Sequence, residues 1–542
     1  MRWLGAAAAG GLITAAAFPD LGWWPAALVG VALLAAHREV ESVRAVTARW
    51  FVWGLSFFLV HVSWAQQAAG AVAWFALATV ESILVAAVGA AWAAARRARW
   101  VTSRTTVQAV VFASVWVAGE QLRAVWPFGG FPWGRLAFSQ TDGPLLGLAW
   151  LGGAPLVSFA VALIAYLLTA TLTAWRRGEV RTGVWLTALA AAAVLVGPAV
   201  PLDTSAQAGT LRVGVVQGNV PEPGTDGAAR AWRVLTNHVE GTKSLATQPG
   251  AEPVDLVIWP ENATDIDPRQ DPRAAALVQE GAAAINAPIL VGTDRDTPAG
   301  RYNDMVVWDP RRGPLTSYSK QQPAAFGEYV PLRALVRVFS PEVDRVSIDM
   351  IPGTKPGVLS VPAPRLHRDI PAATAICFEV AYDNLVRDAV VRGGQFIAVP
   401  TNNASFGRSP QSTQQLAMSR LRAVEHGRAV IQASTVGVSA VIAPDGTMNL
   451  RTSLFTAETL TAQIPLRTAL SPADRARDAP VAVATVAALI AVGSGVVTSR
   501  RRRPPVHPSR PGTVALRLFW RSFSRPRWRL VVGHRHGVSV SS

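Results

Sequence analysis

Long apolar stretches dominate the first part of this chain, and short apolar runs separated by polar residues follow them. A stretch of about 20 apolar residues is long enough to cross a bilayer as a helix. The pattern therefore predicts seven membrane-spanning helices before residue 202 and one more near the C-terminus. The predicted spans cover residues 3–19, 21–36, 50–68, 70–95, 105–126, 144–174, 183–201 and 479–498.

From residue 210 onward the pattern is that of a folded domain outside the membrane. Short β-branched runs alternate with helix-like stretches, and Pro, Gly, Asn and Asp separate them. Several runs are apolar throughout, as strands buried on both faces are. This alternation predicts an α/β domain with layered sheets and outer helices. Predicted strands are 211–217, 256–259, 289–292, 305–308, 374–376, 396–399 and 439–442, and predicted helices are 274–285, 382–392 and 412–426.

The composition agrees with a membrane protein. Half of the residues are hydrophobic and 16% are charged, against roughly 25% charged residues in an ordinary soluble domain. A second apolar run follows 3–19 at once, so we expect that stretch to remain as a span, with a cleaved signal peptide as the alternative. The expected division is a membrane domain at 1–201, an α/β domain at 202–478, a membrane helix at 479–498 and a basic tail at 499–542.

Arginine residues collect in alternate loops between the predicted spans, and cytoplasmic loops are where positive charge accumulates. These loops share one side of the membrane if the N-terminus is cytoplasmic. Both termini are then inside, and residues 202–478 lie outside the cytoplasm. Arg123 and Arg135 depart from this rule. The basic segments are 38–49, 96–104, 176–181 and 500–503.

The formal net charge of +16 is concentrated at the C-terminus, because residues 500–542 carry eleven arginines and no acidic residue. Trp520 and Trp528 lie among these arginines. A basic tail with aromatic residues at the cytoplasmic membrane face can bind anionic lipid headgroups. A solvated tail is an equal alternative, and nucleic acid is the least favoured partner.

Cys377 is the only cysteine in the sequence, and it stands where an apolar run ends and a helix-like stretch begins. A thiol on such a turn suits a covalent nucleophile, although a lone cysteine is more often an inert buried residue. Glu261 follows the predicted strand 256–259, and Lys320 follows a further strand-like run, Leu315–Tyr318. Ligand sites in α/β sheets gather at the carboxyl ends of strands, so the three side chains can converge. The sequence has neither zinc-spaced Cys and His residues nor a Walker-type loop, so we expect no metal and no nucleotide cofactor.

Several short motifs, in their order and spacing, resemble the nitrilase (carbon–nitrogen hydrolase) superfamily. With predicted spans on both sides of them, residues 1–498 resemble the apolipoprotein N-acyltransferase family. The resemblance implies an αββα sandwich on the outer face of the bacterial plasma membrane. The motifs are Trp259-Pro260-Glu261, Lys320, Phe326-Gly327-Glu328-Tyr329-Val330-Pro331, Cys377-Phe378-Glu379, Thr401-Asn402-Asn403 and the stretches 131–140, 420–428 and 437–440.

The resemblance implies a ping-pong acyl transfer. Cys377 would attack the acyl ester of a membrane phospholipid and form a thioester. The thioester would then pass the acyl group to the α-amine of diacylglyceryl-cysteine in an apolipoprotein. Glu261 would act as general base and acid. Lys320 would stabilise the oxyanion, together with the backbone N–H of Phe378.

Supporting roles and departures from the family pattern accompany this resemblance. Glu328 would orient Lys320, and Glu379 would support the nucleophile turn or the substrate amine. The departures can reflect an altered substrate preference or a reduced activity. They are Phe378 in place of the usual Tyr, Asn403 in place of Asp and Ser405 in place of Trp.

Other functions fit the same residues. A membrane-tethered amidase or nitrilase would use the same Glu-Lys-Cys set with water as the acyl acceptor. A catalytically silent scaffold would bind lipoproteins or partner enzymes. Transport is less favoured: Glu81 and Glu120 are the acidic residues deep in predicted spans, and we expect no paired charges there. The sequence leaves open the donor phospholipid, the lipoprotein acceptors and the oligomeric state.

Overall fold

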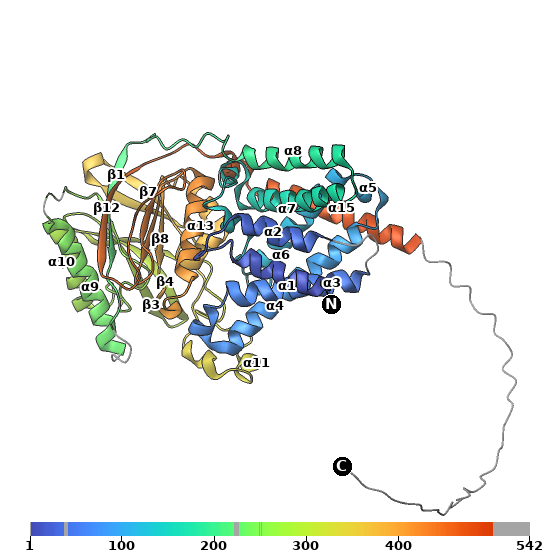
Figure 1. Cartoon of the computed structure of the whole chain (residues 1–542). Coiled ribbons are helices and arrows are strands. Elements are labelled where there is room, and N and C mark those ends of the chain that lie inside the picture. The colour runs from blue at the N-terminus through green and yellow to red at the C-terminus, as the bar shows by residue number, and fades with distance from the viewer. Residues whose placement is uncertain (1, 37–41, 222–226, 249, 251, 502–542) are drawn as a thin grey trace, which may run out of the picture. The chain divides into compact units, whose positions relative to one another are not determined.

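The structure is a computed structural model, and it describes residues 2–36, 42–221, 227–248, 250 and 252–501 (Figure 1). The described residues up to Ser499 belong to one compact unit. Beyond residue 501 the basic tail lies outside the described residues. Its predicted contact with lipid headgroups therefore stays a prediction.

Apolar helices make up the N-terminal part of the chain and return at its C-terminal end. Among the described residues, four helices are long and apolar enough to cross a membrane: Val43–His61, Ala65–Ala95, Leu148–Arg176 and Ala479–Arg500. The prediction of membrane helices is confirmed, and the count of eight spans stays a prediction. The helices are α1 (Arg2–Ala15), α2 (Pro25–Ala35), α3 (Val43–His61), α4 (Ala65–Ala95), α5 (Arg99–Thr102), α6 (Thr105–Val125), η1 (Leu136–Gln140), α7 (Leu148–Arg176), α8 (Val180–Val196) and α15 (Ala479–Arg501).

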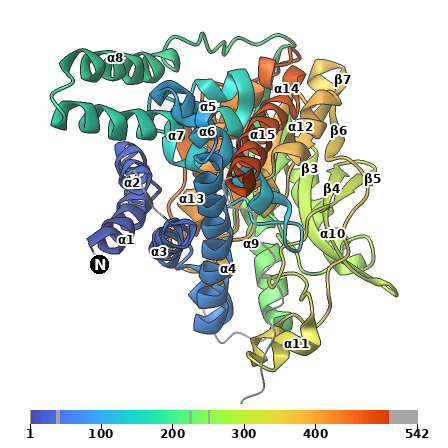
Figure 2. The ribbon, with the colours of Figure 1, turned by 90° about the vertical axis from the view of Figure 1, so that its right-hand side faces the viewer.

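The C-terminal helix α15 lies against the N-terminal helices (Figure 2). A Cβ atom at Gly495 would lie 1.8 Å from the carbonyl oxygen of Ala94 in α4, so a larger residue would separate the two backbones. Segments far apart in the sequence therefore belong to one group of helices.

A buried ion pair lies between α4 and α6. Arg123 Nε is 2.5 Å from Glu81 Oε2, and both side chains are buried. The same guanidinium donates a 2.7 Å hydrogen bond to the carbonyl of Trp133. The expectation that the predicted spans contain no paired charges is therefore wrong. The ion pair also explains why Arg123 can lie on the side of the membrane where few arginines are expected. The charge of Glu81 neutralises that of Arg123 in an apolar setting.

Within the described residues, twelve strands form two six-stranded sheets. The strand orders are β12-β1-β2-β3-β4-β5 and β11-β10-β9-β8-β7-β6. The central strands run parallel: β1, β2 and β3 in the first sheet, and β7, β8 and β9 in the second. The strands are β1 (Thr210–Gln217), β2 (Leu256–Ile258), β3 (Ile289–Thr297), β4 (Gly300–Asp309), β5 (Gly313–Ser319), β6 (Val358–Ala363), β7 (Arg368–Thr374), β8 (Phe396–Thr401), β9 (Val430–Ser434), β10 (Ala440–Ile442), β11 (Met448–Arg451) and β12 (Glu458–Pro465).

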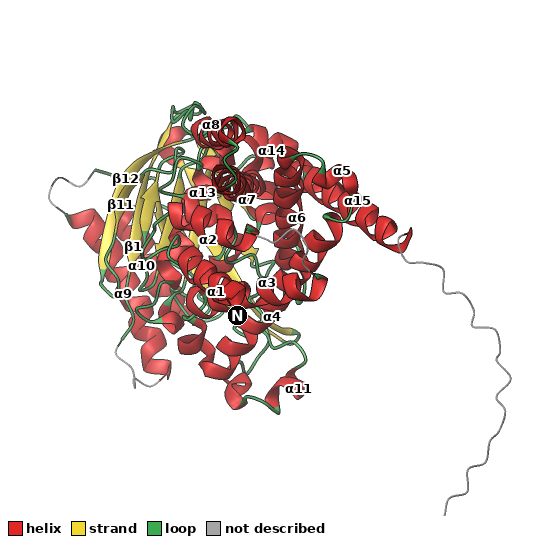
Figure 3. Ribbon diagram, turned by 45° about the vertical axis from the view of Figure 1, so that its right-hand side comes forward, coloured by secondary structure: helices red, strands yellow, loops and turns green. Residues whose placement is uncertain are grey.

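Buried apolar side chains join these sheets and the helices outside them into four layers. Val213 of the first sheet and Ile431 of the second belong to the core between the sheets. Trp259 packs with Val278 of α10 on the other face of the first sheet. Figure 3 shows helices outside both sheets. The predicted α/β domain is confirmed, with the layer order α-β-β-α. Its main helices are α9 (Gly227–Thr247), α10 (Pro272–Ile285), α12 (Asp383–Val391), α13 (Gln411–His426) and α14 (Pro472–Ala476).

The outer helices of the second sheet pack against the apolar helices of the N-terminal part. Leu421 of α13 belongs to the same buried cluster as Trp50 of α3 and Leu148 of α7. Gly153 of α7 has a φ of +70°, and a Cβ there would lie 2.6 Å from Glu425 Oε1 of α13. Glycine suits this contact because it accepts the left-handed backbone and leaves room for the neighbouring helix.

The strand before Cys377 ends earlier than predicted. The sequence predicts a strand at 374–376, whereas β7 ends at Thr374. Ala375 still donates a 3.0 Å backbone hydrogen bond to Ala398, but the N–H of Ile376 bonds to a side chain. The chain therefore leaves the sheet just before the cysteine. The sequence pattern also fails to predict α9, β6, β9, β11 and β12.

Candidate active site

Three loops bring Glu261, Lys320 and Cys377 together. Glu261 follows β2, Lys320 follows β5, and Cys377 opens the short helix η4 (Cys377–Ala381) after β7. The exposed fractions of these residues are 3%, 3% and 4%, so all of them are buried. Lys320 Nζ lies 2.9 Å from Glu261 Oε1 and 2.8 Å from Glu328 Oε1. The structure thus places an ammonium group between two carboxylates, within electrostatic reach of a buried thiol.

Two asparagines fix the Glu261 carboxylate. Asn303 Nδ2, on β4, donates to Glu261 Oε1 at 2.7 Å and to Glu328 Oε1 at 3.2 Å. The backbone N–H of Asn402 donates to Glu261 Oε2 at 2.8 Å. Sequence reasoning missed both contacts. Asn402 belongs to a motif that the sequence displays, whereas Asn303 lies inside a strand and no local pattern marks it.

Lys320 is held as a cation. Burial alone would lower the pKa of Lys320, but the negative charges of Glu261 and Glu328 outweigh it and raise the pKa well above its usual value. The backbone of Lys320 is fixed too, because its N–H donates to Asn303 at 2.8 Å and its carbonyl accepts from Gly353 at 2.7 Å. Lys320 can therefore stabilise a developing negative charge, but it cannot act as a base at neutral pH.

Cys377 stands on a strained turn. Its φ is +54°, a left-handed conformation that residues other than glycine rarely adopt. Its Sγ atom lies 3.2 Å from Thr401 Oγ1, which can donate a hydrogen bond to it. Burial and the charge of Glu261 raise the pKa of the thiol to about 12, while Lys320 and Thr401 act in the opposite direction. The resting side chain is therefore a thiol, and a base is needed to generate the nucleophile.

Glu379 ties the nucleophile turn to the loop that follows Lys320. Its Oε2 accepts a 2.8 Å hydrogen bond from the N–H of Ile376, directly before the cysteine. Its Oε1 accepts hydrogen bonds from the N–H groups of Gln321 at 2.7 Å and Gln322 at 3.1 Å. Burial raises the pKa of Glu379 to about 7, although Lys320 and these hydrogen bonds act against the shift. The carboxyl group thus contacts backbone from both loops.

Aromatic side chains surround Phe378, the residue after the nucleophile. The ring of Trp133 lies 4.6 Å from the Phe378 ring, and the rings of Trp64 and Phe406 lie 6.0 and 6.1 Å from it. The indole N–H groups of Trp64 and Trp133 donate to Gln414 Oε1 of α13 at 3.2 and 2.7 Å. Trp64 and Trp133 come from the N-terminal part, so the nucleophile turn lies at the junction of that part with the α/β domain.

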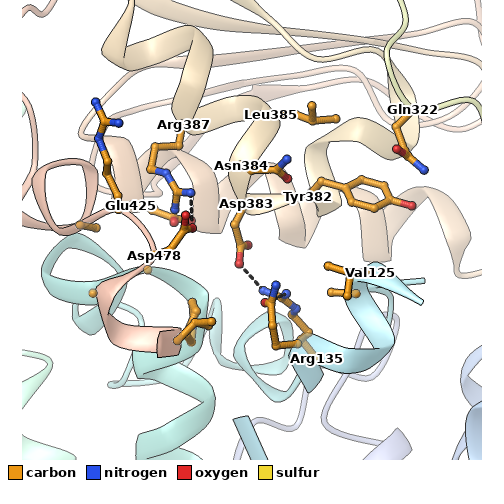
Figure 4. Close-up of a pocket in the computed structure, with 18 of the residues that line it drawn as sticks. Val125, Arg135, Gln322, Tyr382, Asp383, Asn384, Leu385, Arg387, Glu425 and Asp478 are labelled. Carbon is orange, nitrogen blue, oxygen red and sulfur yellow. Dashed lines mark hydrogen bonds and ion pairs between the residues drawn. The ribbon is translucent and has the colours of Figure 1, made fainter. Parts of the chain in front are cut away.

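A cavity of about 390 Å³ is lined by residues that follow the nucleophile turn, Tyr382 and Asp383 among them (Figure 4). Arg135 Nη1 lies 2.5 Å from Asp383 Oδ2 on its wall. Arg422 also pairs with Asp383, at 2.7 Å, and its Nε donates to the carbonyl of Val380 at 2.8 Å. These paired charges connect the loop after α6 to the residues that follow Cys377. Lining residues include Val125, Gln322, Tyr382, Leu385, Glu425 and Asp478.

The chemistry of this arrangement follows from its parts. A carboxylate, a fixed ammonium and a thiol on a turn can transfer an acyl group through a covalent intermediate. The site residues predicted from the sequence lie in or beside this cluster, and Asn303, Asn402 and Thr401 lie there as well. In the described part of the chain, no group of three His, Cys, Asp or Glu side chains is placed to hold a metal ion.

Comparisons with known proteins cover both parts of the chain. Residues 10–167 match the family model of the Apolipoprotein N-acyltransferase N-terminal domain, and residues 212–471 match that of Carbon-nitrogen hydrolase. A protein of Mycolicibacterium smegmatis named Apolipoprotein N-acyltransferase is 39% identical over 542 residues, covering 95% of this chain and 88% of that protein. A protein of Azotobacter vinelandii with the same name is 32% identical over 507 residues, covering 89% and 94%.

The chain is also similar to a solved structure of an amidase from Nesterenkonia sp., with a TM-score of 0.37, 19% identity and coverage of 52% of this chain and 99% of that chain. The two sequence relatives cover 95% and 89% of this chain, so they match both the apolar helices and the α/β domain. The resemblance drawn from the motifs is confirmed. This chain belongs to the apolipoprotein N-acyltransferase family.

Proposed function

We propose that this membrane enzyme transfers an acyl chain from a phospholipid to the N-terminal α-amine of diacylglyceryl-cysteine in apolipoproteins, through a thioester on Cys377. The relatives named Apolipoprotein N-acyltransferase support the reaction. The observation that carries the mechanism is the contact of Lys320 with both Glu261 and Glu328 beside the buried thiol. This set provides a base, a cation and a nucleophile in one place.

In the first half-reaction, Glu261 accepts the proton of Cys377 and the thiolate attacks the ester carbonyl of the phospholipid. The oxyanion that forms is stabilised by the Lys320 ammonium and the backbone N–H of Phe378. When the C–O bond breaks, Glu261 returns its proton to the leaving alkoxide. A lysophospholipid departs, and the acyl group stays on sulfur as a thioester.

In the second half-reaction, the α-amine of the acceptor attacks the thioester carbonyl. Glu261 accepts a proton from the nitrogen, and the oxyanion again faces Lys320. The C–S bond then breaks, the amide product leaves, and the sulfur regains the proton from Glu261. The carboxylate thus performs the same exchange twice. Asn303 and Asn402 keep it in one orientation throughout.

Lys320 depends on its partners for this role. A lysine side chain with one contact would be free to rotate, whereas Glu261 and Glu328 hold its Nζ at 2.9 and 2.8 Å. Glu328 is itself fixed, because the N–H of Ala324 donates to its Oε2 at 2.6 Å. Glu328 and Glu379 therefore act as positioning residues. A preorganised cation costs no rearrangement as charge develops in the transition state.

Both substrates are anchored in the membrane, and the position of the site suits such substrates. The Phe378 ring contacts Trp133 and Trp64 of the apolar part, so the nucleophile turn lies next to the helices that would face lipid. Confining enzyme and substrates to one surface favours their encounter. The distribution of arginines supports a plasma membrane protein with its α/β domain outside the cytoplasm and both termini inside.

Intact-mass spectrometry tests the proposal. Purified wild-type protein and Cys377→Ala are incubated with phospholipid, and a diacylglyceryl-cysteine peptide is added afterwards. We expect an added acyl mass on the wild type alone, and transfer of that mass to the peptide amine. Because Cys377 is the only cysteine, a thioester on the protein has a unique position.

The other outcomes decide between the remaining functions. An acyl adduct that water discharges and the peptide does not would indicate a hydrolase. The lack of any adduct with either protein, in samples that are folded, would overturn the thioester mechanism and favour a silent scaffold. An adduct on Cys377→Ala would place the nucleophile elsewhere.

A further inference from the structure

Thr401 is the last residue of β8, next to the strand that leads to the nucleophile. β8 runs parallel to β7, with Ala398 opposite Thr374, so the end of β8 lies beside Cys377. Thr401 Oγ1 is 3.2 Å from Cys377 Sγ and 3.1 Å from Gln415 Oε1 of α13. Thr401 and Gln415 are fully buried, so water does not compete for these contacts.

The hydroxyl group faces two acceptors with one hydrogen. A threonine hydroxyl donates a single hydrogen bond and can accept others. When it donates to Gln415, its oxygen is free to accept the S–H of the thiol. When it donates to sulfur, Gln415 Oε1 still accepts from Asn403 Nδ2 at 3.0 Å and Gln411 Nε2 at 3.3 Å. The hydroxyl can therefore leave Gln415 without stranding a buried oxygen.

We propose that Thr401 is a second stabiliser of the Cys377 thiolate, and that its hydroxyl rotates from Gln415 to sulfur whenever the thiolate forms. This inference rests on the proposed role of Cys377 as nucleophile and adds a residue to that site. The rotation moves no proton between residues: the thiol proton goes to Glu261, and Thr401 keeps its own hydrogen. The hydroxyl points to Gln415 while sulfur is a thiol or a thioester.

The charges around the thiol explain why a neutral donor is useful. The charged groups that face it are Glu261 after β2, Lys320 after β5 and Glu328 in the following loop, while α13 presents the neutral Gln415. The ammonium of Lys320 is shared by two carboxylates, so the trio carries a net negative charge when both are ionised. A hydroxyl donor stabilises the thiolate without adding another charge to a buried site.

The same contact serves the leaving step. The sulfur departs from the second tetrahedral intermediate as a thiolate, and the hydroxyl can turn back to it as the C–S bond breaks. Loss of the Thr401 hydroxyl should therefore slow both acylation and deacylation, unlike the loss of a substrate contact specific to one half-reaction.

The test is alkylation of the full-length protein in detergent with iodoacetamide, followed by intact mass between pH 7 and 10. Cys377 is the only cysteine, so the part of the alkylation that a parallel Cys377→Ala sample lacks reports this thiol. Thr401→Val keeps the shape of the side chain and removes the hydroxyl, whereas Thr401→Ser keeps the hydroxyl. We expect Thr401→Val to react about tenfold more slowly at pH 8, because its rate–pH curve should be shifted toward higher pH by about one pH unit. Thr401→Ser should stay within about twofold of the wild type.

Coincident rate–pH curves for the wild type and Thr401→Val would overturn the proposal, as would a serine variant that behaves like valine. If Thr401→Val does not fold, the pair Thr401→Ala and Thr401→Ser is judged by the same criterion, because its members also differ by the hydroxyl. Alkylation needs neither phospholipid nor apolipoprotein. A hydroxyl-dependent rate–pH curve without any acyl adduct would thus support the role of Thr401 and refute the transferase mechanism. An acyl adduct with coincident rate–pH curves would support the transferase mechanism and refute the role of Thr401.

Discussion

Arg135 Nη1 lies 2.5 Å from Asp383 Oδ2, and this ion pair joins the loop after α6 to the first residue of α12. Arg422 pairs with the same carboxylate from α13. Burial would raise the pKa of Asp383, but the two guanidinium groups lower it well below its usual range. Asp383 follows the nucleophile turn closely, so the pair links the apolar part to the catalytic loop.

Replacing Asp383 by Asn should destabilise the protein strongly. The change leaves Arg135 and Arg422 buried without their shared countercharge, which typically costs about 3 kcal/mol or more. The measurement is the thermal unfolding midpoint in detergent. Asp388→Asn on the same helix is the control, because its pair with Arg392 is half exposed and is worth under about 1 kcal/mol. Equal midpoints for the two variants would contradict the structural role of Asp383.

Lys320→Met should abolish most of the acyl transfer. It removes the cation that faces the oxyanion and leaves Glu261 and Glu328 to repel each other. The expected loss in kcat is about 100- to 1000-fold. Transfer to the peptide amine is the readout, and the exposed Lys355→Met is the control. A Lys320→Met enzyme that keeps more than about a tenth of its rate would remove Lys320 from the mechanism.

Glu379 predicts a specific dependence of stability on pH. Its pKa is raised from 4.5 to about 7 in the folded protein, so between these values the folded state retains a proton that the unfolded state has released. The free energy of unfolding contributed by this group therefore falls as the pH rises through that range, by roughly 3 kcal/mol in total. Glu379→Gln lacks this titration.

Unfolding midpoints measured from pH 4.5 to 7 check this prediction. The wild type should lose stability relative to Glu379→Gln as the pH rises, even though the variant starts from a lower stability because its amide cannot accept every hydrogen bond. The exposed Glu240→Gln should follow the wild-type curve. A constant difference between wild type and Glu379→Gln would show that Glu379 titrates normally.

Trp133→Ala should loosen the contact between the two parts of the chain. The Trp133 side chain is fully buried, packs on Phe378 and donates to Gln414. Removing it leaves a cavity and takes away one of the two hydrogen bonds that Gln414 Oε1 accepts, at an expected cost of about 3 kcal/mol or more. Trp126→Ala, seven residues earlier and 57% exposed, should cost under about 0.5 kcal/mol. Similar unfolding midpoints for both variants would contradict the packing role of Trp133.

Local patterns predicted much of the catalytic cluster and little of its support. Glu261, Lys320 and Cys377 follow strands or strand-like runs, and that position is visible in the sequence. Asn303 and the pairing of Arg135 with Asp383 depend on contacts between distant segments, the latter 248 residues apart. Because such contacts form only when the layers assemble, no local spacing reveals them.

The strands of the two sheets also differ in how well the local sequence predicts them. Among the parallel central strands, β1, β2, β3 and β8 are apolar runs that the hydrophobic pattern marks, whereas β7 overlaps its predicted strand only at Thr374 and β9 is not predicted. β12 pairs with β1 along its whole length although the two strands are far apart in the chain. Most residues of β12 are partly exposed, so its apolar content is too weak to predict a strand. Edge strands owe their position to a neighbour more than to their own sequence.

The buried cluster that joins α13 to α3 and α7 limits how the sequence of this enzyme can evolve. The helical part forms a wall of the α/β domain, so the two are not interchangeable modules. A substitution on the outer face of α13 must suit the helices beside it, and Gly153 shows how close that contact is. A chimera that joins a relative's α/β domain to these helices should therefore fail to fold unless its α13 keeps the residues that contact α3 and α7. The two contacting surfaces are expected to evolve together.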